Sequence, residues 1–400
     1  MPFAVYVLGL AVFAQGTSEF MLSGLVSGIA TDLGVSIPAA GLLTSGFAVG
    51  MVIGAPLMAL FSRNWPRRRA LLVFLGAFIA VHVVGAVTTS YPLLLATRVV
   101  GALANAGFWA VALVTAVALV APEARARATS VVVGGVTVAC VAGVPAGAVL
   151  GEQWGWRAAF WAVALVSVPA VLAVARAVPD AVPEESGTTG VREELRAPTG
   201  ARLLVTLGAM ALVQGATFCA FSYLEPLVTG VTGLGAGWVP VVLALFGVGS
   251  FVGVTLAGRL PEARTDALIA AGMAALAIGW AVLGLAASNA VAVTVLVLLQ
   301  GMLAFGTGTA LISRVFLLAA GAPSLAGAFA TAAFNVGGAL GPWLGGLAIG
   351  AGYGFRAPLW VSGLLMALAL GAAGALSAMR RVGGPYPRGE STQETEISGS

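Results

Sequence analysis

Charged side chains inside long apolar runs are the first candidates for chemistry in this sequence. Glu19 and Arg98 are the deepest of them, whereas Glu225 and Arg314 lie nearer the ends of their runs. An ionised side chain at the centre of a bilayer costs roughly 2.5–3.5 kcal/mol on insertion scales, so each one needs a partner or a function. A carboxylate beside an arginine can alternate between an ion pair and a neutral acid. Glu19 and Arg98 are therefore the predicted proton-coupling residues.

The depths of these two residues support the pairing. Glu19 lies roughly eight residues, and Arg98 roughly six, from the outer ends of their runs, which is ~12 Å and ~9 Å at the helical rise. We expect the two side chains to meet, with Glu19 ionised when paired and neutral when the pair breaks. A purely structural ion pair is the alternative. His82 is the only histidine, and we expect a satisfied or peripheral side chain there rather than a proton relay.

Polar and aromatic side chains recur at helical spacing around these charges. Arg98, Asn105 and Trp109 share one helical face, as do Gln15 and Glu19. Such mixed faces suit a pocket that binds an amphipathic small molecule. The predicted substrate-cavity residues are Gln15, Asn105, Trp109, Gln214, Phe218, Phe221, Glu225, Gln300 and Arg314.

Several of these side chains also have a structural interpretation. Asn105 could instead form a hydrogen bond between helices. For Glu225 and Arg314, which lie near the ends of their runs, the alternative is a buried ion pair or a side chain that reaches toward the membrane surface.

Membrane helices must position these residues. The chain has 400 residues, of which 60% are hydrophobic and only 8% are charged, against about 25% charged residues in a soluble protein. Twelve spans of ~20 residues would use the whole apolar content. A composition so rich in apolar residues and so poor in charge excludes a soluble globular protein, a disordered chain and a nucleic-acid binder. It predicts an all-α integral membrane protein with spans near 4–27, 39–61, 71–88, 92–120, 128–150, 157–177, 202–224, 238–258, 267–286, 291–318, 326–350 and 357–378.

The arginines predict the orientation of these spans. All 19 basic residues are arginine, and most of them fall on one side when the N-terminus is placed in the cytoplasm. Only Arg157 and Arg356 fall in loops on the other side. Because cytoplasmic loops are enriched in basic residues, both termini are predicted to be cytoplasmic.

The sequence repeats itself at a spacing of 199 residues. Gln15 and Gly16 return as Gln214 and Gly215, and Gly155 returns as Gly354. A single glycine of this kind is explained by close helix packing, but several at one spacing indicate two parallel six-helix halves. The predicted parts are an N-terminal half at 1–177, a cytoplasmic linker at 178–201, a C-terminal half at 202–378 and a disordered cytoplasmic tail at 379–400.

Two segments, Gly16–Met21 and Ala40–Ser45, resemble the drug:proton antiporters of the major facilitator superfamily and their sugar- and nucleoside-efflux relatives. The resemblance covers nearly the whole chain. The gating motif of these antiporters is similar to two segments of this sequence. In the first segment, one residue separates the glycine from the proline. The residues that match this antiporter motif are Gly143, Pro145, Gly147, Gly341 and Pro342.

Two further motifs of the family are present with departures. Arg98 followed by Gly101 resembles the fourth-span arginine motif, which the family ties to proton coupling, but the usual Gln-Gly is absent. Arg63, Arg67 and Arg68 resemble the basic loop motif, although its acidic residue is missing, with Ser62 near that position. Positive charge that fixes the topology is the alternative reading of this loop.

The first two spans and Leu103–Phe108 are most similar to the chloramphenicol exporters within this family. The resemblance implies a cytoplasmic-membrane antiporter, not an enzyme, that expels chloramphenicol or a related drug in exchange for protons by alternating access. A sugar or nucleoside exporter is the alternative. We expect lipid, drug and protons as the partners of a monomer, with no nucleic acid, no metal and no cofactor other than the coupling proton.

Overall fold

The structure, a computed structural model, describes residues 1–62, 64–179, 200–259, 264–319 and 323–382, without the side chains of 59, 323–325 and 375–382. These residues form helices and no strand. Among these described residues, twelve helical segments are long and apolar enough to cross a membrane. In lipid a helix satisfies its backbone N–H and C=O groups internally, which is why such apolar runs become helices. The predicted all-α membrane fold with twelve spans is confirmed.

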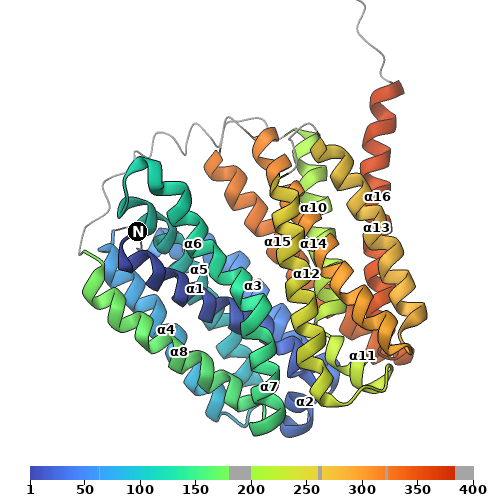
Figure 1. The fold of residues 1–400 in the computed structure, drawn as a ribbon, viewed down its shortest axis with the longest axis horizontal. Coiled ribbons are helices and arrows are strands. Elements are labelled where there is room, and N and C mark those ends of the chain that lie inside the picture. Colours follow the sequence, from blue (N-terminus) through green and yellow to red (C-terminus); the bar gives the residue numbers. More distant parts are fainter. Residues whose placement is uncertain (63, 180–199, 260–263, 320–322, 383–400) are drawn as a thin grey trace, which may run out of the picture.

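The first six spans form the N-terminal half, on the left of Figure 1. The fifth span contains a π-helical turn between two α-helices, and a short helix follows the first span. The elements are α1 (Phe3–Phe20), η1 (Met21–Gly24), α2 (Val26–Leu33), α3 (Ile37–Ser62), α4 (Arg67–Val87), α5 (Tyr91–Ala118), η2 (Pro122–Ala124), α6 (Arg125–Val138), the π-helical η3 (Ala139–Gly143), α7 (Val144–Trp154) and α8 (Trp156–Ala177).

The last six spans form the C-terminal half, on the right of Figure 1. The elements are α10 (Ala201–Phe221), α11 (Leu224–Gly230), η4 (Ala236–Trp238), α12 (Val239–Arg259), α13 (Thr265–Ala286), α14 (Ala290–Leu318), α15 (Pro323–Ala348), η6 (Ile349–Tyr353) and α16 (Ala357–Val382). Helix α16 thus continues past residue 378, where the last span was expected to end. Residues 180–199 of the predicted linker and 383–400 of the predicted tail lie outside the described residues.

The two halves repeat each other at their turns. Gly34 and Gly233 have φ of 64° and 75°, and Gly155 and Gly354 have φ of 81° and 73°. Side chains other than glycine rarely adopt such angles. Both pairs are separated by the 199-residue spacing that the sequence shows.

Helix packing repeats at the same spacing. A Cβ on Gly50 would press against the carbonyl of Val99, where α3 crosses α5. A Cβ on Gly249 would overlap the carbonyl of Leu298, where α12 crosses α14. Glycine lets the two backbones approach this closely in each half. The predicted repeat of two six-helix halves is therefore confirmed.

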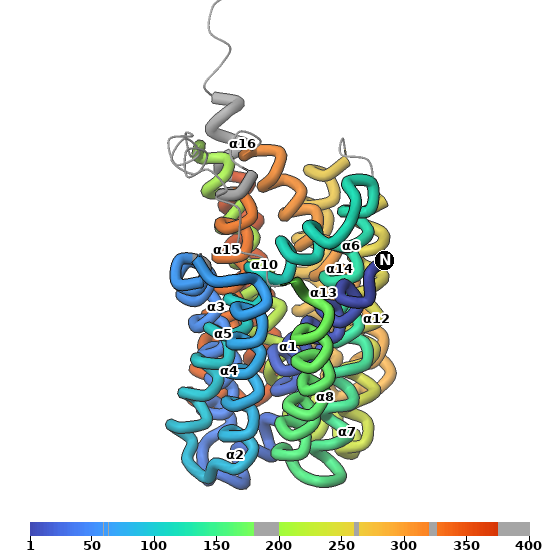
Figure 2. Tube along the Cα trace, turned by 90° about the vertical axis from the view of Figure 1, so that its left-hand side faces the viewer, coloured from blue at the N-terminus to red at the C-terminus, as the bar shows by residue number. Residues whose placement is uncertain are grey.

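The halves meet along two flanks, which Figure 2 shows on either side of α1. On one flank α3 packs against α15, and the Ser45 hydroxyl donates a hydrogen bond of 2.7 Å to the carbonyl of Ala339. On the other flank α12 packs against η3 and α7. There a Cβ on Gly247 would overlap the carbonyl of Cys140. The π-helical turn η3 therefore lies directly against the backbone of the other half.

The halves converge at the end of the molecule that carries α2, α7 and α11 and diverge toward the opposite end (Figure 1). At the convergent end the backbone N–H of Ser27 donates a hydrogen bond of 3.0 Å to the Glu225 carboxylate. This bond joins α2 of one half to α11 of the other. The divergent end carries the arginine-rich connections, which are predicted to be cytoplasmic.

Outside the spans, Asp32 of α2 ties the convergent end to α8. Its carboxylate accepts a hydrogen bond of 3.1 Å from the Trp156 indole and pairs with the Arg157 guanidinium. The hydrogen bond from Arg157 lowers the pKa of Asp32 below its usual value. The same guanidinium donates to the carbonyl of Thr88 at 2.9 Å. Arg157, which sequence analysis placed in an outer loop, thus fastens the loop ends of the N-terminal half.

We expect Gly249→Ala to lower the melting temperature of the purified protein, because the new Cβ would overlap the Leu298 carbonyl. Overpacking of this kind costs about 1–3 kcal/mol. Gly258→Ala, in the same helix, is the matched control, since its Cβ would have open space around it and alanine favours a helix by about 1 kcal/mol over glycine. Equal melting of the two variants would contradict the close-packing argument.

We expect Glu225→Leu to weaken the convergent end, because it leaves the Ser27 N–H without its acceptor across the two halves. An unsatisfied donor costs about 1–3 kcal/mol when it is fully buried, and less at a partly buried site such as this one. Glu225→Gln keeps one acceptor oxygen and should lose less. Thermal melting in detergent measures the difference. If leucine and glutamine melt alike, this hydrogen bond does not hold the two halves together.

Candidate functional site

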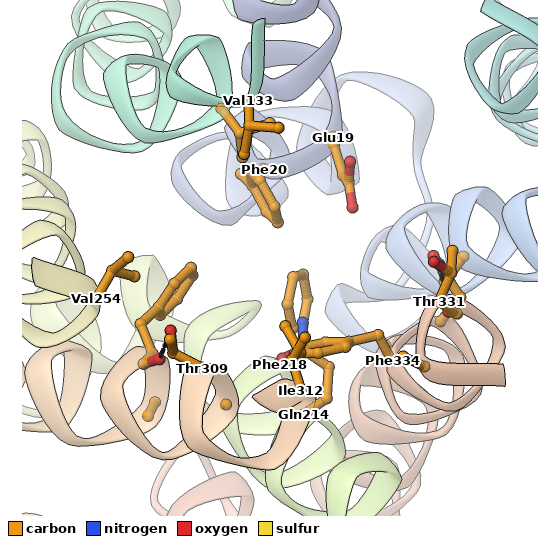
Figure 3. Close-up of a pocket in the computed structure, with 18 of the residues that line it drawn as sticks. Glu19, Phe20, Val133, Gln214, Phe218, Val254, Thr309, Ile312, Thr331 and Phe334 are labelled. Carbon is orange, nitrogen blue, oxygen red and sulfur yellow. Dashed lines mark hydrogen bonds between the residues drawn. The ribbon is translucent and has the colours of Figure 1, made fainter. Parts of the chain in front are cut away.

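A central cavity of about 530 Å³ lies between the two halves. Helices α1, α3, α5 and α6 line it from one side, and α10, α12, α14 and α15 from the other. Figure 3 shows Glu19, Phe20 and Val133 facing Gln214, Phe218 and Ile312 across the open space. The lining reaches Val254, Phe316 and Gly327 toward the divergent end of the molecule. The cavity is therefore shared by both halves and faces the arginine-rich end.

Aromatic rings cover much of the cavity wall. Phe20 of α1 and Phe218 of α10 approach each other across the two halves, with ring centroids 5.5 Å apart. Behind them Phe221 packs against Phe246 at 4.6 Å, and Phe246 contacts Phe305 at 6.1 Å. A lining of this kind favours flat apolar solutes.

Among the described residues that line this cavity, Glu19 is the only acidic one. Its side chain points into the open space (Figure 3). A second cavity of about 390 Å³ shares Glu19, Trp109, Gly327 and Thr331 with the first. The two are thus parts of one space with Glu19 and Trp109 at their junction. The other polar side chains of the wall are those of Thr44, Thr137, Gln214, Thr309, Thr331 and Asn335.

Arg98 of α5 is buried beside this cavity, with 2% of its surface exposed. Its Nη1 donates to the Ser18 hydroxyl at 2.8 Å, and its Nη2 donates to the Ser18 carbonyl at 2.8 Å. The guanidinium carbon lies 4.5 Å from the ring centroid of Phe47. Within the described part of the chain no ion pair joins Arg98 to Glu19, although the two charges attract each other. The direct ion pair expected between Glu19 and Arg98 is therefore not formed among the described residues of this structure.

Two further predicted cavity residues lie behind the wall. Gln15 is fully buried in α1, and neither atom of its amide has a hydrogen-bond partner in the structure. Asn105 is fully buried as well and points toward α3, where its Nδ2 lies 3.4 Å from the Met51 sulfur. Trp109, one helical turn beyond Asn105, does line the cavity. The face shared by Arg98, Asn105 and Trp109 therefore turns partly into the N-terminal half.

Gln300 and Arg314 of α14, which were expected to line the cavity, pack against α13 instead. The Gln300 Nε2 donates to the carbonyl of Leu276 at 3.3 Å, and Arg314 forms an ion pair with Asp266. A Cβ on Gly272 would overlap the Thr307 hydroxyl. Gln300, Thr307 and Arg314 thus form a seam inside the C-terminal half. Arg314 borders a separate cavity of about 460 Å³ there.

The predicted cavity residues of α10 and α11 lie in different places in the structure. Gln214 and Phe218 line the central cavity. Phe221 supports Phe218 from behind, with ring centroids 6.1 Å apart. Glu225 lies at the convergent end on Ser27, beside a small cavity of about 80 Å³ that also borders Glu152.

Residues of the antiporter motif lie at close helix contacts. A Cβ on Gly143 would overlap the Thr17 hydroxyl of α1, and a Cβ on Gly341 would overlap the carbonyl of Gly215 on α10. Gly147 faces Met21, the first residue of η1, directly after α1. Pro145 follows the π-helical turn at the start of α7.

Pro342 lies inside α15, and its carbonyl accepts a hydrogen bond of 2.7 Å from the Tyr223 hydroxyl. The motif residues on α7 and α15 therefore pack the interface-forming helices against the first helix of each half.

The basic loop motif is only partly visible. Arg63 lies outside the described residues, whereas Arg67 and Arg68 begin α4 and are partly buried. Next to them, the Arg69 guanidinium lies over the Trp65 ring at 5.7 Å.

Sequence reasoning missed the residues that α14 and α15 contribute to the cavity. On α14 these are Phe305, Thr309, Ile312 and Phe316, which share one helical face. That face lies about 170° around the helix from the seam of Gln300, Thr307 and Arg314, which is nearly the opposite side. The helical spacing of Phe305 and Phe316 could have indicated this face, but the sequence analysis considered only the polar residues of the span.

The comparisons with known proteins agree with this architecture. A model of the Major Facilitator Superfamily matches residues 8–324. The chain is 52% identical over 372 residues to a chloramphenicol resistance protein of Streptomyces lividans, covering 92% of this chain and 95% of that protein. It is 31% identical over 372 residues to the inner membrane transport protein YdhP of Escherichia coli (strain K12), covering 92% and 94%.

The fold also has solved counterparts. The crystal structure of a bacterial homolog to the human lysosomal transporter Spinster, in an inward-facing and unoccupied conformation, matches with a TM-score of 0.76. The match covers 96% of this chain and 98% of that chain at 16% identity, so it supports the fold alone. Proteins of the matched family are transporters, not enzymes. The chain therefore belongs to the major facilitator superfamily and is a multi-pass transport protein of the cell membrane.

Proposed function

We propose that this transporter expels chloramphenicol or a closely related drug from the cell in exchange for protons. The observation that carries the proposal is the central cavity, in which one carboxylate faces an otherwise neutral, aromatic wall. The relative named as a chloramphenicol resistance protein, at 52% identity, supports the choice of substrate.

The wall of the cavity fits a neutral aromatic drug. Phe20, Phe218 and Phe334 offer ring faces, and the hydroxyl of Thr309 and the amide of Gln214 offer hydrogen bonds. Chloramphenicol presents a flat ring at one end and hydroxyl and amide groups at the other. A site for a sugar or nucleoside would need more hydrogen-bonding side chains, because each polar group of the solute leaves water on binding.

The arrangement of Glu19 and Arg98 supports the coupling step. Glu19 has access to the cavity, whereas Arg98 is held on Ser18. A proton and a drug that compete for the space at Glu19 would produce exchange: protonation of Glu19 from outside favours the return of the empty carrier, and loss of the proton inside prepares it for drug. The cavity faces the arginine-rich end, which the positive-inside rule assigns to the cytoplasm.

Alternating access would use the contacts between the halves. The convergent end is closed by α2, α7 and α11, and the cavity lies behind it. Rocking of one half against the other along the α3–α15 and α7–α12 flanks would open this end and close the other. Exchange of one neutral drug for one proton moves one charge inward, worth about 2.3 kcal/mol per 100 mV, or roughly a fiftyfold drug gradient.

A susceptibility test addresses the function. The chain is expressed in a drug-sensitive host, and growth on chloramphenicol is compared with and without an uncoupler. We expect protection that the uncoupler removes. A cavity variant, Phe218→Ala, should lose protection, whereas Thr206→Val serves as the control, because Thr206 is half-buried on α10 outside the central cavity. A host that remains sensitive, with the protein present in its membrane, would favour the sugar or nucleoside exporter.

We expect Glu19→Gln to bind drug but to build no drug gradient, because glutamine cannot take up or release the coupling proton. Purified protein in vesicles with an imposed proton gradient is assayed for radiolabelled chloramphenicol uptake, and drug–drug counterflow is measured in parallel. Glu152→Gln at the convergent end is the matched control. A full proton-driven gradient with Glu19→Gln would show that another group carries the proton.

A further inference from the structure

A chain of hydrogen bonds runs from Arg98 into the N-terminal half and ends on a histidine. Arg98 Nη1 donates to the Ser18 hydroxyl at 2.8 Å. The Ser18 oxygen lies 2.6 Å from Nε2 of His82 on α4, and Nδ1 of His82 lies 2.7 Å from the carbonyl of Phe78. At least 98% of the surface of each of the three polar side chains is buried. His82 is therefore part of a buried network whose middle side chain is Ser18.

The partners of His82 determine where its proton lies. The Phe78 carbonyl can only accept a hydrogen bond, so Nδ1 must carry a hydrogen and donate. A second hydrogen on Nε2 would create a second buried cation beside the Arg98 guanidinium, which is unfavourable because the two like charges would repel each other in an apolar interior. The network is therefore consistent with one neutral form of His82, protonated on Nδ1 and unprotonated on Nε2.

This form of His82 fixes the direction of the Ser18 hydroxyl. An unprotonated Nε2 accepts, so the Ser18 O–H donates to it. The lone pairs of the Ser18 oxygen then remain for Arg98 Nη1. Without the acceptor on His82, the Ser18 hydrogen is free to rotate toward the guanidinium and oppose this bond. The histidine thus orients the hydroxyl on which the arginine rests.

Packing holds His82 at this position. Its ring centroid lies 4.1 Å from that of Phe78 and 5.7 Å from that of Phe160. The ring is thus fixed between α4 and α8, whereas Ser18 belongs to α1 and Arg98 to α5. Adjacent residues of a helix point about 100° apart, so Ser18 turns toward this network while Glu19 turns toward the cavity.

We propose that His82 is a positioning residue for proton coupling, which holds Arg98 on Ser18 and away from a direct bond to Glu19. The proposal rests on the proposed proton-coupled function. With Arg98 retained on Ser18, the Glu19 carboxylate remains available to a proton or a drug in the cavity. A histidine that merely fills the core would leave coupling unchanged when an apolar residue of similar size replaced it.

The state of His82 can be measured directly, because it is the only histidine of the sequence. Protein labelled with ¹⁵N-histidine, reconstituted in lipid without an affinity tag of histidines, should give one pair of ring signals. We expect a protonated-type shift at Nδ1 and an unprotonated-type shift at Nε2. An imidazolium, or a hydrogen on Nε2 alone, would overturn the proposal. This test does not depend on transport.

A transport experiment tests the role. His82→Gln keeps an acceptor near the position of Nε2, whereas His82→Leu removes it. In vesicles we expect His82→Leu to lower the proton-driven drug gradient roughly five- to tenfold, as for one lost buried hydrogen bond, while drug–drug counterflow persists. His82→Gln should stay within about twofold of the unmodified protein. An unchanged gradient with His82→Leu would overturn the proposal.

Two serine variants make the same comparison if His82→Leu does not fold. Ser18→Ala removes the hydroxyl that Arg98 uses, and Ser18→Thr retains it, so only the alanine variant should lose coupling. Thr115→Val is the control, because Thr115 is a buried residue of α5 that bonds only within its own helix. If the unmodified protein itself shows no proton-driven gradient, the proposed function fails. Equal coupling with Ser18→Ala and Ser18→Thr would refute the role assigned to the network.

Discussion

Close approach of helix backbones at glycine is the constraint on which this structure depends. Between helices in a bilayer there is little hydrophobic driving force, so the packing of complementary surfaces must hold them together. Gly50 and Gly249 permit the same crossing in the two halves, and Gly247 brings α12 onto the carbonyl of Cys140 in η3. The first two contacts build each half, and the third joins them. The cavity is the space that these contacts leave between the halves.

The arginines inside this frame follow a second rule, which is that their guanidinium groups bond to other groups of the protein where water is scarce. Arg98 uses the hydroxyl and the carbonyl of Ser18, and Arg314 uses Asp266. Glu19 differs from both because it faces the cavity without such a bond. A charge that is not fully satisfied by the protein can respond to a proton or a solute, which is why Glu19 is the centre of the proposed mechanism.

Much of the fold could be predicted from the sequence, and part of the site. The number of spans and the repeat were correct, because length in apolar residues and glycine spacing are local properties of the chain. Trp109, Gln214 and Phe218, which were expected in a substrate cavity, line a cavity between the halves together with Glu19, and their role toward a substrate stays a prediction. Gln15, Asn105 and Gln300 were expected there too, but they lie within the two halves in this conformation. Their role toward a substrate stays a prediction.

The sequence by itself determined that the chain crosses a membrane, where the spans lie, that the halves repeat and that Glu19 and Arg98 lie at similar depth. Only the tertiary structure decided which face of each helix meets the cavity. In a soluble protein the apolar face of a helix points toward the core. Here lipid and core are both apolar, so hydrophobicity does not indicate which face of α14 points inward. The polar seam of α14 in fact faces α13. Likewise, the position of His82 depends on four helices that come together around Ser18. These contacts join residues far apart in the sequence, so local spacing does not predict them.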